Sequence, residues 1–465
     1  MFLRHKARYV GRGDLRKFKP KSLKETFLPT GSQYTFNLRL NNIILNKLDY
    51  VIADADTAYL NAIFEGLLYM VLDPEVVKIM LKIDPSVKDY VNEDGTMYVR
   101  ITKALYGLQE SAKLWYNTLA TAMQEIGFRK SSYDEALFFR KEQDGSMTFI
   151  FVYVDDMLFS GRKENLRATL DALQAKFKLK ESEMSPRQFD FLGMRCRRDS
   201  KDDGSFILSQ PGLIDEIIAD CKETAATPCD VKLYIETDAR LFKDVTKFRS
   251  LLMKVMYVSR TRPDLKVALG YLATRMQAPT FGDWEKLQRV VKYLNGTKHM
   301  GLRYKPVENM QVYASSDASY GPFKDGKSNT GLVITVGYPN APIIARSSKQ
   351  KSVANSSTAA ELIAFSTTLE EVLWMVNLLE ELGFEQDTVQ IEQDNQSTMR
   401  LIEKGPSSAG RTKWLNIKYF WVNEKKQEGI FDTKYVESLK LLADGLTKPL
   451  GKKAFIAWRQ RILNH

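Results

Sequence analysis

Three aspartates in the first half of the chain stand at the ends of strand-like apolar runs. Asp54 closes one such run, and Asp155 and Asp156 separate the two apolar arms of a predicted hairpin over 147–161. Adjacent acids at a hairpin tip are often turn formers, and for this pair alone that interpretation stays open. Because apolar arms are buried, we expect the tip to point into a cleft. Carboxylates gathered there repel one another unless cations bind, and their hard oxygen ligands suit Mg²⁺ ions that promote phosphoryl transfer.

Four further acids stand at predicted element ends in the second half of the chain. Asp317 follows a short apolar strand, Glu361 lies near the start of a long helix, Asp394 follows another strand, and Asp444 precedes the last helix. Each has a structural alternative. Thr358 and Glu361 fit a Ser/Thr-x-x-Glu capping box, and the aspartates at 394 and 444 fit the N-caps of the helices that follow them.

The elements that must hold the first acids follow from the spacing of apolar residues. The pattern predicts a helical stretch and a strand within 36–70, a helix over 102–127, and an amphipathic helix over 162–180 after the hairpin. A helical block is expected over 245–295.

The composition loosens near 297–309, and a different order of elements follows. The pattern there predicts three strands within 311–347 and a long helix over 358–382. Two more strands, 389–392 and 433–436, each lead into a helix. This order is typical of a mixed sheet covered by helices.

Composition narrows the class of protein. The 465 residues suffice for roughly two to four domains, and the net charge of +11 is compatible with nucleic acid. Nine Lys and Arg stand against one acid in the first 24 residues, for which a solvated basic tail is the alternative. The three cysteines are too few and too scattered for a disulfide framework. We see no secretory signal and no apolar run long enough for a membrane span, so we expect a soluble intracellular protein with no membrane partner.

The motifs around the first acids resemble those of copia-type (Pseudoviridae) retrotransposon Pol proteins. Tyr153-Val154-Asp155-Asp156 resembles the catalytic box of reverse transcriptases, and the run Asp54 to Ala62 resembles their first aspartate motif. Further matches occur in order along nearly the whole chain: Lys6-Ala7-Arg8, Glu25-Thr26-Phe27, Lys103 to Ser111 with Trp115-Tyr116, Phe191-Leu192-Gly193, Thr261 to Asp264, and Tyr293 to Thr297. Ala112 departs from the family, which usually has proline there.

The resemblance implies roles for the residues of the first site. Asp54 and Asp155 would bind two metal ions, and Asp156 would complete the acidic site. Tyr59 would lie under the incoming sugar and reject a 2′-hydroxyl, with a buried core aromatic as the alternative. Two residues would line the nucleotide and template pocket, Tyr106 and Gly107.

Two softer assignments come from the same resemblance. Lys6 and Arg8 would reach the triphosphate, although flexible basic arms often contact phosphate without specificity. Phe191, Leu192 and Gly193 would form the primer grip, with a plain strand edge as the alternative.

The four later acids lie in motifs that resemble copia-type ribonuclease H. These motifs are Ser316 to Gly321, Ser356 to Glu361, Asp394 to Ser397, and Ala443 to Leu450. By that resemblance the four acids would hold two Mg²⁺ ions, with Mn²⁺ able to replace them, and water would attack the RNA of an RNA–DNA hybrid. Three departures lower the expectation of full ribonuclease H activity: Ala359, Trp414 and Asn416.

The implied fold class is a multidomain α+β chain, a right-hand polymerase followed by a ribonuclease H-like mixed-sheet domain. We expect fingers and palm over 1–195, a thumb and connection over 196–305, and the ribonuclease H-like domain over 306–465. The implied partners are an RNA template, a DNA primer, RNA–DNA hybrid and deoxynucleotides, with integrase or capsid as further candidates.

The expected location is the cytoplasm, in a virus-like particle, or the nucleus, and we do not expect the protein to be secreted. The alternative function is a truncated or co-opted retrotransposon remnant that binds nucleic acid without turnover.

Overall fold

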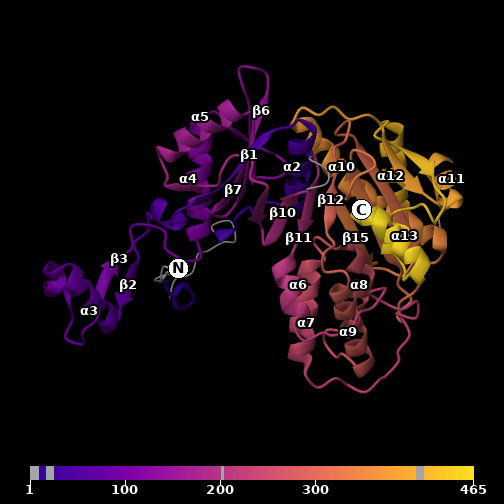
Figure 1. Cartoon of the computed structure of the whole chain (residues 1–465), viewed down its shortest axis with the longest axis horizontal. Helices are drawn as coiled ribbons and strands as arrows, with labels where there is room; N and C mark the ends of the chain where they lie inside the picture. The colour runs from indigo at the N-terminus through magenta and orange to yellow at the C-terminus, as the bar shows by residue number, and fades with distance from the viewer. Residues whose placement is uncertain (1–9, 17–25, 200–203, 405–412) are drawn as a thin grey trace. The chain divides into compact units, whose positions relative to one another are not determined.

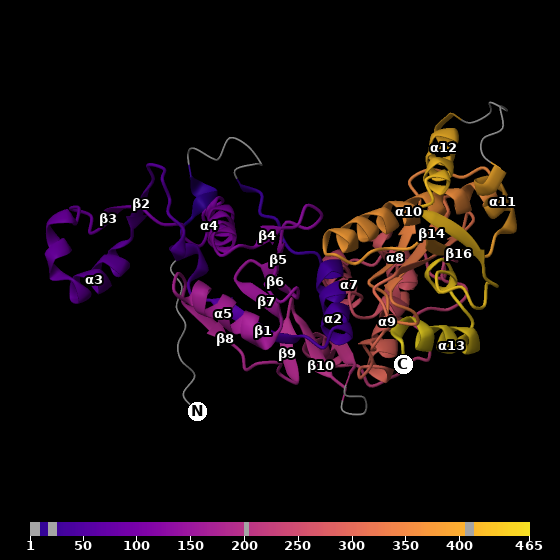
Figure 2. The same cartoon turned by 90° about the horizontal axis from the view of Figure 1, so that it is seen from above.

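The computed structural model describes residues 10–16, 26–199, 204–404 and 413–465 (Figures 1 and 2), with the side chains of 413–417 left out of the description. The chain forms two compact units. The first unit comprises Met1–Ser32 and Asp49–Ser185, and the second comprises Gln33–Leu48 and Pro186–His465. The domain limits expected at residues 195 and 305 stay a prediction.

The first unit is built on a six-stranded sheet of order β4-β5-β6-β7-β1-β8. Its strands are β1 (Asp49–Ala55), β4 (Arg129–Lys130), β5 (Leu137–Lys141), β6 (Met147–Tyr153), β7 (Asp156–Gly161) and β8 (Leu179–Glu181). The hairpin expected over 147–161 is confirmed as β6 and β7, and β1 pairs antiparallel with β7.

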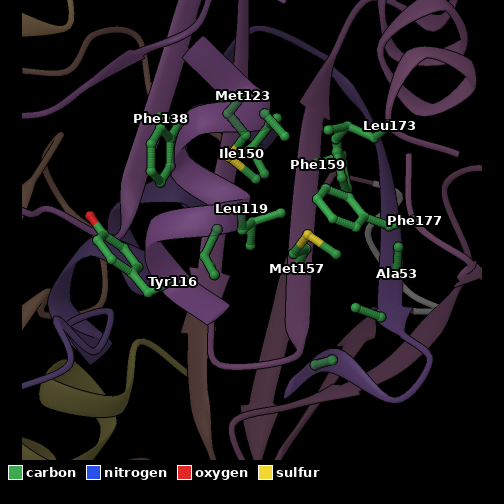
Figure 3. Packing of buried hydrophobic residues seen from close by; sticks show 14 of the residues in the cluster. Ala53, Tyr116, Leu119, Met123, Phe138, Ile150, Met157, Phe159, Leu173 and Phe177 are labelled. Atoms are coloured by element: carbon green, nitrogen blue, oxygen red, sulfur yellow. The ribbon is translucent and has the colours of Figure 1, made fainter. Parts of the chain in front are cut away.

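One face of this sheet is covered by two amphipathic helices, α4 (Ser111–Glu125) and α5 (Lys163–Gln174). Leu119 and Met123 of α4 face Ile150 of β6, and Leu173 of α5 lies near Phe159 of β7 (Figure 3). These side chains belong to one buried cluster. The packing of α4 and α5 in this cluster therefore holds in place the strands that end at the predicted acids.

The helix expected over 102–127 is wrong at its start, since α4 begins only at Ser111. The Ser111 hydroxyl donates to the carbonyl oxygen of Leu105 at 2.7 Å and accepts from the Leu105 amide at 3.0 Å. These two hydrogen bonds hold the preceding segment as a loop. Two short 3₁₀ helices of this unit are η1 (Gly13–Leu15) and η2 (Ala58–Asn61).

A small lobe of the first unit, defined here as residues 69–100, stands away from the six-stranded sheet in both views (Figures 1 and 2). It pairs two strands antiparallel and packs one helix against them around Leu72, Val77 and Met97. Its elements are β2 (Tyr69–Leu72), α3 (Pro74–Ile83), η3 (Pro85–Tyr90) and β3 (Met97–Arg100). The periodicity of the sequence did not predict this lobe.

The second unit begins with α2 (Gln33–Leu45), the helical stretch expected early in the chain. A four-stranded antiparallel sheet of order β12-β11-β10-β9 belongs to this unit, and Phe36 of α2 stacks on Phe191 of β9 with ring centroids 5.1 Å apart. The strands are β9 (Gln188–Phe191), β10 (Met194–Arg198), β11 (Phe206–Ser209) and β12 (Leu302–Tyr304). The helical block expected over 245–295 is confirmed as α7 (Val245–Val258), η4 (Pro263–Leu265), α8 (Lys266–Ala273) and α9 (Phe281–Gly296), and α6 (Pro211–Ile218) precedes it.

The mixed sheet expected after residue 309 is confirmed, with strand order β15-β14-β13-β16-β17. Its first three strands are antiparallel, whereas β16 and β17 run parallel to β13. The strands are β13 (Val312–Ser319), β14 (Asn329–Val336), β15 (Ile344–Lys349), β16 (Val389–Gln393) and β17 (Phe431–Tyr435). The helices are α10 (Ser357–Glu381), α11 (Gln396–Lys404), α12 (Lys413–Gln427), η5 (Asp444–Leu446) and α13 (Lys452–Leu463). The expected multidomain α+β class, with a mixed sheet covered by helices in its second half, is therefore confirmed.

The long helix α10 is apolar enough, over enough residues, to cross a bilayer, and it is the single such helix in the described ranges. Most of it is buried against β13 and β14 within the second unit. Burial in a protein core accounts for that composition.

Candidate active sites

The tip of the β6–β7 hairpin is a two-residue turn in an unusual backbone conformation. Tyr153 pairs with Asp156, which leaves Val154 and Asp155 as the turn. Val154 has φ 61°, a conformation that β-branched residues rarely adopt. Two hydrogen bonds hold the turn: the Trp115 indole N–H donates to the Val154 carbonyl oxygen at 2.8 Å, and the Ala55 amide donates to the Asp155 carbonyl oxygen at 3.1 Å. Strain of this kind persists only where the surroundings enforce it, and it is found at functional sites.

The three predicted aspartates of the first site come together at this tip. Asp54 is directly opposite Asp156 in the β1–β7 pairing, and Asp155 adjoins it in the turn. Burial, followed by the negative charges of Asp155 and Asp54, raises the pKa of Asp156 to about 6. An aspartate that only forms a turn in water has no such surroundings. The mutual repulsion of the three aspartates favours a bound cation.

The aromatic predicted beneath the incoming sugar lies next to these acids. Tyr59, in η2, is half-buried, and its ring centroid is 4.5 Å from that of Tyr106. Burial, and then the charge of Asp155, raises the pKa of Tyr59. Its partial exposure disfavours the alternative of a core aromatic.

Gly107 occupies a position that only glycine fits. Its φ is +92°, and a Cβ there would lie 2.0 Å from the carbonyl oxygen of Gly11. The Gly11 amide in turn donates to the Tyr106 carbonyl oxygen at 2.8 Å. The segment around Gly11 thus lies directly on the predicted nucleotide pocket. Lys6 and Arg8 lie outside the described residues, so their predicted triphosphate contact stays a prediction.

The predicted primer grip is a tight turn in the second unit. Phe191 ends β9, and Leu192 and Gly193 form the turn into β10 with φ values of 54° and 68°. The Tyr257 hydroxyl donates to the Leu192 carbonyl oxygen at 2.9 Å, and a Cβ on Gly193 would lie 2.7 Å from that hydroxyl. The turn is therefore held in one shape by α7. Its contact with a primer stays a prediction.

The second site gathers acids from three elements of the mixed-sheet region. Asp317 on β13, Glu361 on α10 and Asp394 after β16 offer carboxylate oxygens that all lie within 4.8 Å of one another. Asp444 is also buried, and the Lys448 ammonium lies 2.5 Å from its Oδ1. Three of the four predicted acids thus meet in one cluster, and the charge of Asp444 is near enough to raise the pKa of Asp317.

Burial and mutual repulsion disturb the titration of these acids. Burial, then Asp317 and Asp394, raises the pKa of Glu361 to about 9. Burial raises the pKa of Asp317 to about 6, although the hydrogen bond from Thr447 opposes the shift. Burial raises the pKa of Asp444 as well, opposed by Lys448. A cluster of carboxylates that disfavours its own ionisation is chemically suited to a hard divalent cation.

The capping alternatives for these acids are wrong. Ser356, not Thr358, caps α10, and its hydroxyl accepts from the Ala359 amide at 3.1 Å. Asn395 takes the corresponding role at α11 and accepts from the Thr398 amide at 3.0 Å. No side-chain cap is found at η5, where Asp444 lies, and the N-cap of α13 is Gly451. The capping interactions therefore leave the carboxylates of Glu361, Asp394 and Asp444 available for chemistry.

Four polar residues support the second site without having been predicted. The Thr447 hydroxyl donates to Asp317 at 2.5 Å, and the Ser438 hydroxyl donates to Asp394. The Gln393 amide donates to Glu361 at 3.4 Å, and Lys448 pairs with Asp444. Thr447 and Lys448 belong to the motif that ends at Leu450, so their spacing from Asp444 was the available signal. The side chains of Trp414 and Asn416 lie outside the described residues.

The sequence of this chain matches a known protein family and its members. The family model described as "Reverse transcriptase (RNA-dependent DNA polymerase)" matches residues 2–234, half of the chain. The chain belongs to the reverse transcriptase family. It is 30% identical over 99% of its length to the Retrovirus-related Pol polyprotein from transposon RE2 of Arabidopsis thaliana, and 26% identical over its full length to that from transposon TNT 1-94 of Nicotiana tabacum. The resemblance to copia-type retrotransposon Pol is thereby confirmed.

This reverse transcriptase chain spans 30% and 34% of the lengths of those two polyproteins. A solved structure of foamy viral protease-reverse transcriptase in complex with double-stranded DNA is 13% identical, with a TM-score of 0.48 over 85% of this chain and 59% of that one.

Proposed function

We propose that this reverse-transcriptase-type polymerase extends a primer with deoxynucleotides on RNA or DNA templates and also cleaves the RNA of RNA–DNA hybrids. The observation that carries the polymerase activity is the meeting of Asp54, Asp155 and Asp156 at a strained turn that other residues hold in place. Such a turn is costly, and a fixed carboxylate geometry is what two-metal phosphoryl transfer requires.

In the polymerase site, Asp54 and Asp155 would hold two Mg²⁺ ions, or Mn²⁺ in their place. Bound metal supplies charge stabilisation for an in-line displacement at the α-phosphate of the nucleotide. Tyr59 lies beside Tyr106 and close enough to Asp155 for its pKa to respond to that charge. A half-buried ring in that position supports its proposed role of excluding a 2′-hydroxyl, so that deoxynucleotides are the substrate.

In the ribonuclease H site, two further Mg²⁺ ions, or Mn²⁺ in their place, would be held by Asp317, Glu361, Asp394 and Asp444. The pKa of Glu361, raised to about 9, supports this assignment. A carboxyl group that is hard to ionise without a cation becomes a stable carboxylate when a cation binds beside it. Thr447 and Ser438 orient two of the carboxylates through hydrogen bonds to Asp317 and Asp394. Supporting contacts of this kind fix the direction in which ligands point.

The proposed partners are primer–template, RNA–DNA hybrid and deoxynucleotides, with integrase or capsid as candidates for protein contacts. The proposed location is intracellular, in a cytoplasmic particle or the nucleus. Affinity for primer–template should fall steeply with salt, because neutralising backbone phosphates releases counterions.

A single assay with two readouts tests the proposal. A labelled DNA primer annealed to a differently labelled RNA template is incubated with deoxynucleotides and Mg²⁺. Primer growth supports the polymerase, and shortening of the RNA supports ribonuclease H. A folded chain that binds the hybrid but changes neither strand would instead support the non-catalytic remnant.

A further inference from the structure

A cavity of about 210 Å³ lies in the second unit, away from the four acids of the ribonuclease H site. Its walls come from α2, from the segment that joins α7 to α8, and from the residues that lead into β15. Among the residues that line it are Gln33, Asn37, Ser259, Arg260 and Lys266. Neither proposed reaction uses any of these side chains.

Lys266 is a largely buried lysine in the wall of this cavity. Within the described ranges it has neither a hydrogen-bond partner nor an acidic counter-charge, although buried ammonium groups are costly unless paired. Burial first, and then the positive charge of Arg346, lowers the pKa of Lys266 to about 8. The group is therefore still a cation at neutral pH.

Two arginines add positive charge near the cavity or near Lys266. Arg260 lines the cavity and is oriented by Gln33, whose Oε1 accepts from Arg260 Nε at 2.8 Å and whose amide donates to the Arg260 carbonyl oxygen at 2.7 Å. Arg346 also lies near enough to affect Lys266, and its own ion pair is with Glu371 at 2.7 Å. Of these three cations, only Arg346 has a carboxylate partner among the described contacts.

Asn37 supplies a second, independent observation. Its side chain is 2% exposed and lines the same cavity. Its Oδ1 is buried and accepts no hydrogen bond within the part of the chain that the structure describes. Buried polar atoms are nearly always paired, so this oxygen indicates a missing donor.

We propose that this cavity binds a phosphate group. Lys266 and Arg260 supply the positive charge, and Asn37 accepts a hydrogen bond from a hydroxyl that belongs to the ligand. Monohydrogen phosphate carries such a hydroxyl, and so does the ribose beside a backbone phosphate of RNA. The two sources share one chemistry, and the experiment below separates them.

The test begins with the thermal stability of the full chain in chloride and in inorganic phosphate at equal ionic strength. Phosphate should raise the melting temperature of the native chain, because a ligand that binds only the folded state stabilises it. Lys266→Met should lose that increase while folding at least as well in chloride, since the substitution removes a buried charge. Lys453→Met, which changes an exposed lysine of α13, should keep the increase.

Acetylation of lysines by acetic anhydride, read by peptide mass spectrometry on the native chain, separates the sources and needs no variant. Protection of Lys266 by inorganic phosphate identifies a free anion as the ligand. Protection by an RNA–DNA hybrid alone identifies a backbone phosphate. Equal acetylation of Lys266 under all conditions, with no phosphate-dependent stabilisation, overturns the proposal. Neither readout depends on polymerase activity, so this inference and the proposed function fail separately.

Discussion

The indole N–H of Trp115 donates to the carbonyl oxygen of Val154 at 2.8 Å, and Val154 is the residue with φ 61° at the tip of the β6–β7 hairpin. This one hydrogen bond joins the helix that covers the sheet to the turn that carries Asp155. Trp115 is almost fully buried and also packs edge-on against Phe177, with ring centroids 5.3 Å apart. The position of the turn that carries Asp155 therefore depends on the core beneath it.

Trp115→Phe should slow primer extension more than its loss of stability explains. The substitution leaves the Val154 carbonyl without its donor, which costs about 1–3 kcal/mol when the acceptor is buried. If about 1.4 kcal/mol of this loss appears as a higher activation barrier for extension, the extension rate falls about tenfold. Single-turnover extension and chemical denaturation measure the two effects. The control is Tyr116→Phe, at the next residue of α4, which removes the 2.7 Å hydrogen bond that the Tyr116 hydroxyl donates to the carbonyl oxygen of Glu135. Equal rate losses in both variants would contradict the prediction.

Val154→Gly and Val152→Gly should differ strongly in stability, although they lie two residues apart. At Val154 glycine relieves a left-handed conformation worth about 1–2 kcal/mol, which offsets its own entropic cost of about 0.5–1 kcal/mol. At Val152, which is 4% exposed, the same change opens a cavity in the core and should cost at least about 2 kcal/mol. Urea denaturation of both variants compares them directly. A similar loss at both positions would show that the turn is not strained.

Stability without metal should fall as the pH rises between about 4.5 and 9, and Glu361 should be a main cause. The pKa of Glu361 is raised from 4.5 to about 9 in the folded chain, so the folded state holds a proton that the unfolded state has lost in this window. Each such proton lowers stability by up to about 1.4 kcal/mol per pH unit.

Glu361→Gln should flatten this dependence, measured by urea denaturation in a chelator across that pH range. Mg²⁺ should flatten it in the native chain too, because a bound cation replaces the proton. Glu370→Gln, on the exposed side of the same helix, should leave the slope unchanged. An identical slope in all three proteins would refute the environment described for Glu361.

Lys448→Met should lower the Mg²⁺ concentration needed for half-maximal cleavage of the RNA in a hybrid. The Lys448 ammonium lies 2.5 Å from Asp444 and partly neutralises the site, so its removal makes the site more negative. The same change should destabilise the metal-free chain, since it leaves a buried carboxylate unpaired. Lys440→Met, which breaks an exposed pair with Glu437, should alter neither quantity. A higher Mg²⁺ requirement in Lys448→Met would contradict this role.

The elements that could be predicted from the sequence are those with strong local patterns. The β6–β7 hairpin, the mixed sheet and α10 each have a continuous apolar stripe or run, which is a local property of the chain. The lobe over 69–100 does carry a local signal, since Asp73 caps α3 and Pro74 lies in its first turn, but its two strands are only four residues long each. The membership of α2 in the second unit depends on contacts such as the Asn41 amide to the Val336 carbonyl oxygen, 295 residues away in sequence. No local pattern reports such a contact.

Spacing also misled in one instructive place. Thr358 and Glu361 satisfy the capping-box pattern, but the helix begins one residue earlier, and Ser356 caps it. A shift of two residues in the cap removes the structural explanation for Glu361. Of the supporting residues, Thr447 had a signal in its motif, but Ser438 and Gln393 had none, because a hydroxyl or amide gains its role only from the carboxylate that it faces.

The most direct test of the polymerase assignment compares Asp155→Asn with Asp56→Asn in primer extension on an RNA template with deoxynucleotides and Mg²⁺. Asp56 is an acid near the same site, but its carboxylate pairs with Lys180 at 3.1 Å and Lys178 at 3.4 Å. We predict that Asp155→Asn abolishes extension and that Asp56→Asn retains most of it, with both variants folded. Extension that survives in Asp155→Asn, or that is absent from the native chain while primer–template still binds, would contradict the account.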